Sequence, residues 1–534
     1  MTRMADRVED GLLRRGPASG ASKSGLGLTM ATAAVALGVA AALAYGAASA
    51  PATWVLASVA GILLCLAILQ RPLVGALAIV LLAGVVPREL LFDYSLPFAG
   101  GGLKVTDVLL LVTVGSWLLT RYTEPQRRRL PSKRTTWLLM GFLAVAALSL
   151  ATSQYTGTPM KLGLSELRPL LSYLLIFVVV ADLRDPDECN AVVAILLAGS
   201  AVASLEMLFW YVTGSNIGAA TFTQDASRVS PTVFLLPLVG LIVSLGILTR
   251  EGPARRQMLL WLLAAVNSAA LFFTFLRGAW LAVAVGVICL AIFSLPRQKL
   301  RLVTVGAALL ATALLLVIWL NAASLTSSSS PVASAVERLA SVTAPSADPS
   351  AQHRLAEWHR ALQVSGQHPL TGIGLGGTIS FVSPLYSSET GLAGEEFTTS
   401  YLHNSYVWVL LKLGVPGLLL LVALMASILT ESLRSYYVSP VLRTKTLLLG
   451  LVSSLLALMA VAATGPHLTF DAATPLVATV AGMIAAIPVL PLWRRTHPRD
   501  DGVVPEGRAY YVVGPLPRGG SPEHDQESSD RRVT

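Results

Sequence analysis

The sequence predicts an all-α fold, a polytopic bundle of about 14 transmembrane helices, with a range of about 12 to 14. Hydrophobic residues make up 54% of the 534 residues and charged residues only 13%. The mean hydropathy of +0.66 also excludes an ordinary soluble protein. Apolar runs of about 17 to 25 residues, long enough to cross a bilayer as helices, recur from Leu28 to Leu490. Strands of a membrane barrel would alternate polar and apolar residues, and these runs do not.

The apolar runs divide the chain into five parts. Residues 1–26 form a basic tail, 27–320 hold the first eleven spans, 321–414 form a long polar segment, 415–492 hold three more spans, and 493–534 form a second tail. The single spans are predicted, with boundaries uncertain by several residues, at 27–50, 53–69, 73–92, 106–120, 136–152, 167–182, 190–212, 230–249, 257–275, 278–296, 301–320, 415–431, 444–464 and 472–492.

The net charge of +9 comes from cations in short loops between the apolar runs, so it indicates topology rather than a nucleic-acid partner. If the N-terminus is cytoplasmic, every second loop is cytoplasmic, and those loops hold most of the cations. They are Arg71; Arg121, Arg127, Arg128, Arg129, Lys133 and Arg134; Arg184; Arg250, Arg255 and Arg256; Arg297, Lys299 and Arg301; Arg434, Arg443 and Lys445; Arg494 and Arg495. The positive-inside rule therefore places both tails in the cytoplasm, the C-terminal one disordered. The segment 321–414 then lies outside the cytoplasm.

The outer segment is expected to carry short helices. From Gln352 the spacing of four apolar residues predicts an amphipathic helix on the outer membrane surface: Leu355, Trp358, Leu362 and Val364. His368-Pro369 should end it. A turn rich in glycine follows, where backbone amides could approach an anion: Gly372, Gly374, Gly376 and Gly377.

A second outer helix is predicted over Tyr401 to Leu413, with His403 on one of its faces. Proline is best tolerated in the first turn of a helix. We therefore expect the chain to break at Gly414 and the next span to begin near Pro416. This break would keep His403 and Lys412 near the outer interface. The three cysteines, Cys65, Cys189 and Cys289, lack metal-ligand spacing and are expected to be packing residues.

Several motifs resemble the O-antigen ligase and polymerase superfamily. His403-Asn404 is followed after nine residues by Gly414 and after two more by Gly417, which is similar to the histidine signature of the ligases. Three further segments also resemble the superfamily. They are Phe275 to Trp280; the pair Arg354 and Trp358, followed by His368 to Gly374; and Val105-Thr106-Asp107. Two features depart from the family pattern. Leu276 replaces a small hydroxyl residue, and the arginine-to-glycine spacing of the polymerases is missed by one residue at Arg228 to Gly240 and at Arg360 to Gly372.

The resemblance implies a glycosyltransferase of the cytoplasmic (inner) membrane that acts in cell-surface polysaccharide assembly. It would transfer a glycan from undecaprenyl diphosphate to a hydroxyl of a saccharide or glycolipid acceptor at the outer face, as a ligase does. The alternative is a polymerase of lipid-linked repeat units for O-antigen, capsule or exopolysaccharide, with a flippase and a chain-length regulator as partners. An alternative of another class is a lipid-linked oligosaccharide flippase or transporter. Such proteins gather polar groups near the midplane in repeated halves, and this sequence shows no such repeat.

The resemblance and the residue chemistry together predict the site. A neutral histidine is a suitable base for a sugar hydroxyl, and we assign that role to His403. Arginines would neutralise the leaving diphosphate: Arg277, Arg354 and Arg228. Supporting roles fall to Asn404, Arg168, Arg360 and Glu206. No cofactor or metal is expected, and direct displacement would invert the anomeric carbon. His467 and Asp471 match no motif and are left without a role.

Overall fold

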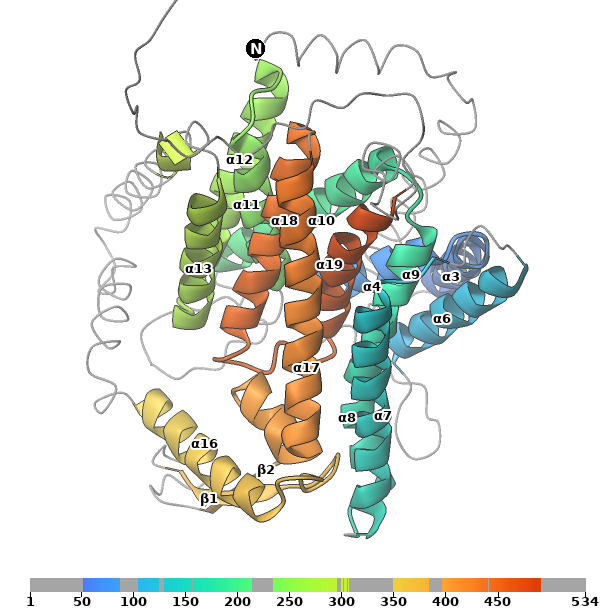
Figure 1. Cartoon of the computed structure of the whole chain (residues 1–534), viewed down its shortest axis with the longest axis vertical. Coiled ribbons are helices and arrows are strands. Elements are labelled where there is room, and N and C mark those ends of the chain that lie inside the picture. The colour runs from blue at the N-terminus through green and yellow to red at the C-terminus, as the bar shows by residue number, and fades with distance from the viewer. Residues whose placement is uncertain are drawn as a thin grey trace, which may run out of the picture.

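The computed structural model describes residues 51–86, 104–123, 129–155, 157–213, 234–294, 299–300, 302–304, 306, 349–383, 396–439 and 441–490. Helices make up most of this part of the chain (Figure 1). Within it, seven helices are long and apolar enough to cross a membrane, and several shorter apolar helices accompany them. The predicted multi-pass helical class is therefore confirmed. The span at 27–50, most of the span at 301–320 and both tails lie outside the described residues, so the total of about 14 spans stays a prediction.

The first half of the chain forms helices close to the predicted spans. They are α3 (Pro51–Gln70), α4 (Pro72–Val85), α6 (Val105–Thr123), α7 (Lys133–Tyr155), α8 (Met160–Leu171), η2 (Ser172–Leu174), α9 (Leu175–Asp182) and α10 (Pro186–Thr213). Three of them begin at a proline. Proline suits the first turn of a helix because it lacks the amide hydrogen that would have no partner within the helix at that position.

The second half supplies α11 (Leu235–Leu248), α12 (Ala254–Phe273), α13 (Arg277–Phe293), α17 (Ser405–Val438), α18 (Leu442–Val461), α19 (Thr474–Ala486) and η4 (Ile487–Val489). Every residue of α4 and of α19 is buried, so these two helices lie inside the bundle and need no polar face. Helices α11 and α18 approach closely where Gly246 meets Gly450, since a Cβ on Gly246 would lie 2.8 Å from the Gly450 Cα.

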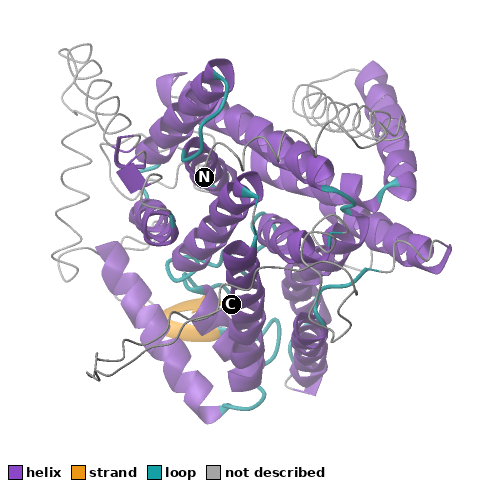
Figure 2. Ribbon diagram, turned by 45° about the horizontal axis from the view of Figure 1, so that its top comes forward, coloured by secondary structure: helices purple, strands orange, loops and turns teal. Residues whose placement is uncertain are grey.

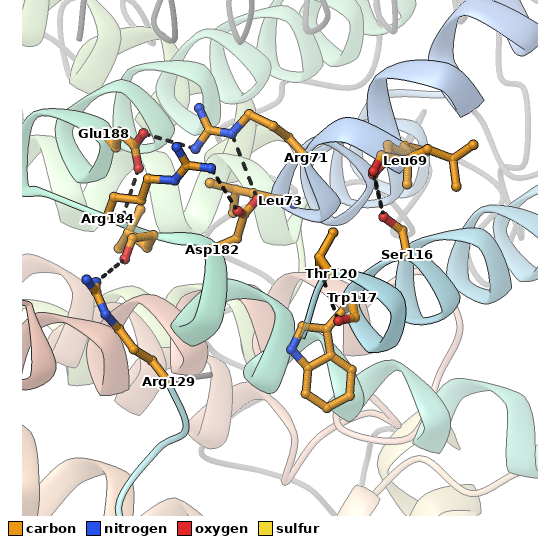
Figure 3. A network of polar contacts seen from close by, with 12 residues as sticks. Leu69, Arg71, Leu73, Ser116, Trp117, Thr120, Arg129, Asp182, Arg184 and Glu188 are labelled. Atoms are coloured by element: carbon orange, nitrogen blue, oxygen red, sulfur yellow. Dashed lines mark hydrogen bonds and ion pairs between the residues drawn. The ribbon is translucent and has the colours of Figure 1, made fainter. Parts of the chain in front are cut away.

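Three loops that the charge pattern assigns to one side of the membrane do meet in the structure. Arg71 Nη2 donates to Glu188 Oε1 at 3.0 Å, and Asp182 Oδ2 accepts from the Leu73 amide at 3.0 Å (Figure 3). Arg129 Nη1 donates to the Leu183 carbonyl at 3.3 Å. The α3–α4, α6–α7 and α9–α10 connections therefore share one end of the bundle.

The segment predicted to lie outside the cytoplasm, called the outer segment, lies at one end of α17 (Figure 1), and Figure 2 draws its two strands in orange. It contains α16 (Pro349–Gln367), β1 (Ile379–Val382) and β2 (Glu396–Thr399). The strands are antiparallel, with Ile379 opposite Thr399 and Val382 opposite Glu396. The all-α prediction missed this two-stranded ribbon, because strands of four residues are too short to show a periodic pattern. Residues 322–348 fall outside the described residues.

Helix α16 ends at Gln367, directly before His368-Pro369, as predicted. Glu357, Ala361 and Ser365, spaced four residues apart, form the face that is buried against the protein. Of the four predicted apolar residues, Leu355 is 54% exposed and Leu362 49% exposed, whereas Trp358 and Val364 are half-buried. The predicted contact of this helix with the membrane surface stays a prediction.

The break in α17 is where the sequence places it. Gly414 has φ 69° and ψ −173° and interrupts the helix two residues before Pro416. A Cβ at Gly414 would lie 2.7 Å from the Leu370 carbonyl carbon, so both the conformation and the space require glycine. The short first part of α17 can thus follow a course different from that of the long second part.

Candidate active site

Asn404 caps helix α17 and fixes the position of His403. Its Oδ1 accepts hydrogen bonds from the amides of Tyr406 at 2.9 Å and Val407 at 3.1 Å. The helix therefore starts at Ser405, and the prediction that His403 lies within it was wrong, since the asparagine cap ends the helix first. The supporting role that the structure gives Asn404 is to orient this turn.

A buried carboxylate holds the His403 ring. The amide of His403 donates to Glu357 Oε2 at 2.9 Å, and His403 Nδ1 lies 3.2 Å from both carboxylate oxygens. The side chain of Glu357 is 1% exposed and that of His403 is 32% exposed. Because a carboxylate only accepts, Nδ1 carries the hydrogen and donates it. In the neutral ring this leaves the Nε2 lone pair available to accept a proton.

Two more histidines lie beside this pair. The rings of His353 and His403 are 6.1 Å apart, and His353 Nδ1 lies 2.7 Å from Ser383 Oγ. Burial lowers the pKa of His353, and Glu357 partly opposes this shift. Burial, with the guanidinium of Arg354 nearby, lowers the pKa of His467 to about 4. Both histidines should therefore be neutral near pH 7, and only His403 has a carboxylate that fixes its tautomer through Nδ1.

Two of the arginines predicted to bind diphosphate, Arg354 and Arg277, lie at the end of the bundle that holds His403. Arg354 is half-buried on α16 and acts electrostatically on His353 and His467. Arg277 begins α13, where a Cβ on the next residue, Gly278, would lie 2.2 Å from Thr464 Oγ1. Thr464 belongs to the connection between α18 and α19. This connection also anchors α17, because the Ser405 amide donates to the carbonyls of Ala462 at 2.8 Å and Gly465 at 3.2 Å. Arg277 thus lies at the same end of the bundle as His403.

The other predicted residues have different outcomes. Arg228 lies outside the described residues. Arg360 is exposed, and its Nε donates to the Ser380 carbonyl at 3.2 Å, so it ties α16 to β1. Glu206 Oε2 is buried and has no hydrogen-bond partner among the described residues. Among the described residues, no arginine forms an ion pair with Glu206, and its supporting role stays a prediction.

Arg168 belongs to a charged cluster at the start of α6. Its Nη1 donates to Asp107 Oδ2 at 3.2 Å, and the Lys104 amide donates to the same oxygen at 2.9 Å. Lys104 Nζ also pairs with Asp471. The neighbouring ring of Phe470 contacts Tyr401, whose ring lies 4.9 Å from that of His403. Arg168 therefore reaches the site through this cluster and not by direct contact with His403.

Lys412 is enclosed by the protein, and its depth in the membrane stays a prediction. Its side chain is fully buried, its Nζ donates to Glu166 Oε1 at 2.9 Å, and it also donates to the Gly377 carbonyl. The Gly376 amide donates to Glu166 Oε2 at 2.5 Å. The glycine-rich turn thus does approach an anion, but that anion is a carboxylate of the protein itself.

His353, Glu357 and His403 together could hold a metal ion, because one ligand atom of each lies within 4.8 Å of the others. The sequence did not predict this cluster. Its donors already have partners: Glu357 accepts from His403, and His353 Nδ1 lies within hydrogen-bond distance of Ser383. These hydrogen bonds account for the positions of the three side chains, so we interpret Glu357 as the hydrogen-bond partner that orients His403.

Sequence reasoning missed Glu357 and His353. The available signal was their spacing, because residues four apart share a helix face and Glu357 is followed at the same interval by Ala361 and Ser365. Reading α16 by its leucines hid that face. His467 carries no motif, and only the fold brings it near His403.

The described fold and site define a multi-pass helical membrane protein with a histidine and carboxylate pair at one end of its bundle. Residues 258–422 match the family model described as O-antigen ligase. The match confirms the resemblance to the O-antigen ligase and polymerase superfamily and covers Arg277, Glu357, His403 and Gly414. Members of that superfamily join glycans, so the match supports an enzyme. No curated protein matches the chain.

Proposed function

We propose that the protein transfers a glycan from undecaprenyl diphosphate to an acceptor hydroxyl at the outer face of the cytoplasmic membrane, as an O-antigen ligase does. The observation that carries this proposal is the contact of His403 Nδ1 with Glu357, 3.2 Å from each oxygen. It supplies an oriented base within the matched residues 258–422, where α16 lies at one end of α17.

In the proposed step, His403 Nε2 takes the proton of the acceptor hydroxyl. The hydroxyl oxygen attacks the anomeric carbon, and the bond from that carbon to the diphosphate breaks. Undecaprenyl diphosphate leaves with the electron pair, and the anomeric carbon is inverted by this single displacement. Glu357 stabilises the imidazolium that forms, because its carboxylate accepts from Nδ1 throughout. Glu357 is thus a positioning residue and His403 the catalytic one.

The leaving diphosphate needs positive charge more than a proton. Arginine is suited to this task, since its planar guanidinium binds two phosphate oxygens at once. Arg354 and Arg277, at the His403 end of the bundle, are the groups we propose for it, and Arg228 remains a third candidate from sequence alone. With arginines in this role, no step requires a metal ion.

Replacing Glu357 tests the pair directly. Glu357→Gln keeps the size of the side chain but lets its amide offer a hydrogen to Nδ1, so the favoured tautomer is lost. We expect transfer to fall by as much as about 10⁴-fold, as when a carboxylate that orients a catalytic histidine becomes an amide, with normal amounts of folded protein, measured with carrier-linked donor. Glu431→Gln is the matched control, because Glu431 accepts from Ser132 and Ser427 near the other end of α17. Equal activity of the two variants would separate Glu357 from catalysis.

Arg277 provides a second test. Arg277→Ala should abolish transfer, and Arg277→Lys should restore little of it, because an ammonium group is a point charge without the two-pronged contact. Arg255, exposed at the start of α12, supplies the control substitutions Arg255→Ala and Arg255→Lys, which should leave transfer unchanged. Normal turnover by Arg277→Ala at matched protein level would return Arg277 to a role at the membrane interface.

The same chemistry would serve a polymerase that adds repeat units to a growing chain. Glycan analysis of a deletion strain separates the two functions. Loss of a ligase leaves long polymer on the carrier, whereas loss of a polymerase leaves single repeat units. The acceptor hydroxyl would belong to a glycolipid or another saccharide for a ligase, and to a saccharide repeat unit for a polymerase.

The proposed orientation puts the basic loops and both tails in the cytoplasm. Reporter fusions after Arg129, Arg255 and Arg443 should then report cytoplasm, and a fusion at Ser383 should report the outside, since cations are retained on the cytoplasmic side. A cytoplasmic signal from Ser383 would place His403 on the wrong side for a carrier-linked donor that has been flipped outward.

A further inference from the structure

A basic cavity lies between the α11–α12 connection and the start of α18. Its volume is about 190 Å³, and its lining includes the side chains of Arg250, Arg256 and Arg443 together with Glu251. The connection is held in shape by Gln257, whose Nε2 donates to the Arg250 carbonyl at 2.7 Å. Neither the family motifs nor the proposed transfer reaction uses this cavity.

The cavity is remote from the candidate active site. Arg443 lies near the first residue of α18, whereas Ala462, which follows the last residue, accepts from the amide of Ser405 beside His403. The 20 residues of α18 correspond to about 30 Å of helix. The two sites therefore occupy opposite ends of the bundle.

Within the described part of the chain, the three guanidinium groups have no ion-pair partner, although Glu251 also lines the cavity. Arg250 and Arg443 both act on Arg256 as like charges. Among the described residues, no carboxylate forms an ion pair with any of the three, in contrast to Arg71 with Glu188 and Arg168 with Asp107. Like charges held side by side repel one another, and a bound anion would remove this cost.

We propose that this cavity binds a phosphate-bearing anion, and that an anionic phospholipid headgroup is its source. Guanidinium groups bind phosphate oxygens in pairs, and basic pockets between membrane helices are suited to lipid headgroups. A drug-sized ligand needs about 300 to 1,000 Å³, so the cavity of about 190 Å³ fits a headgroup and not a larger molecule.

The surroundings favour a lipid over a soluble ion. Ile247 and Leu447 contribute apolar lining to the cavity. On α12, just beyond Arg256, Met258 is 64% exposed and Leu259 is 55% exposed. An acyl chain attached to the bound headgroup could lie along these two side chains, whereas free phosphate would gain nothing from them.

The test uses the purified full-length protein and three probes: phosphatidylglycerol, phosphatidylcholine and inorganic phosphate. Native mass spectrometry measures the retained lipid, and calorimetric titration measures phosphate. The pocket variant combines Arg250→Gln, Arg256→Gln and Arg443→Gln. The control variant removes three charges nearby but outside the lining, through Arg255→Gln, Arg434→Gln and Lys445→Gln.

We expect wild type and the control variant to retain phosphatidylglycerol in preference to phosphatidylcholine. The pocket variant should retain phosphatidylglycerol at least about tenfold less than wild type does. Phosphate binding that is lost only in the pocket variant, without lipid retention, would support the anion site and assign it to a soluble ligand. Equal retention by the pocket and control variants, or no binding of either anion by wild type, would overturn the proposal. Transfer activity is not part of this readout, so failure here leaves the proposed reaction intact.

Discussion

His403→Ala should lose glycan transfer by about 10² to 10⁴, the contribution expected of a general base, while the protein inserts and folds normally. The side chain is 32% exposed, and α17 is capped by Asn404 through its own Oδ1, so the histidine ring is not needed to start the helix. His403→Gln should not restore transfer, because an amide can keep a hydrogen bond to Glu357 but cannot take a proton near pH 7.

The measurement for His403 is turnover of carrier-linked donor by purified protein at matched amounts. His359→Ala and His368→Ala, both at exposed positions, are the controls and should behave as wild type. Wild-type activity should persist in EDTA, since arginines neutralise the diphosphate in the proposed reaction. Near-normal turnover by His403→Ala would contradict the role of His403 as base. Loss of wild-type activity in EDTA would indicate that the His353, Glu357 and His403 cluster binds a metal ion.

Lys412→Met should give the largest loss of stability. The substitution keeps the length of the side chain but leaves Glu166 without its cation, and the side chains of this pair are 0% and 12% exposed. Breaking a buried ion pair on one side costs about 3 to 5 kcal/mol, whereas removing both charges costs much less. The double variant Lys412→Met with Glu166→Gln should therefore recover most of the loss.

The measurement for Lys412 is the free energy of unfolding in detergent mixtures, followed by a fluorescent probe. Lys445→Met is the matched control, because Lys445, in the first turn of α18, lies over the ring of Tyr436 and has no ion pair among the described residues. If Lys412→Met unfolds at the same denaturant concentration as Lys445→Met, the buried pair does not hold the glycine-rich turn.

Features that depend only on neighbouring residues, such as single helices and the break in α17, were predicted well from the sequence. Long apolar runs gave most helices, and Pro416 after Gly414 gave the break in α17, because each reports on its own segment. The ribbon of Ile379–Val382 and Glu396–Thr399 was missed, since strands that short carry no period and depend on a partner distant in sequence.

The site was predictable only in part for a related reason. A motif points to His403, but the roles of its neighbours follow from packing between α16 and α17. Glu357 is buried because α16 packs the face of Glu357, Ala361 and Ser365 against the bundle, and the spacing of the leucines does not mark that face. Lys412 shows the same limit. Its cost in a membrane is resolved by Glu166, which lies 246 positions away in the chain, so no local pattern could reveal it.

A double-mutant cycle on His403 and Glu357 tests the central claim most directly. Transfer rates are measured for wild type, His403→Ala, Glu357→Gln and the double variant with one carrier-linked donor. Residues that act as a unit give losses that do not add, so the double variant should be no slower than His403→Ala alone. If the loss in the double variant equals the product of the two single losses, Glu357 does not act through His403, and the proposed pair is contradicted.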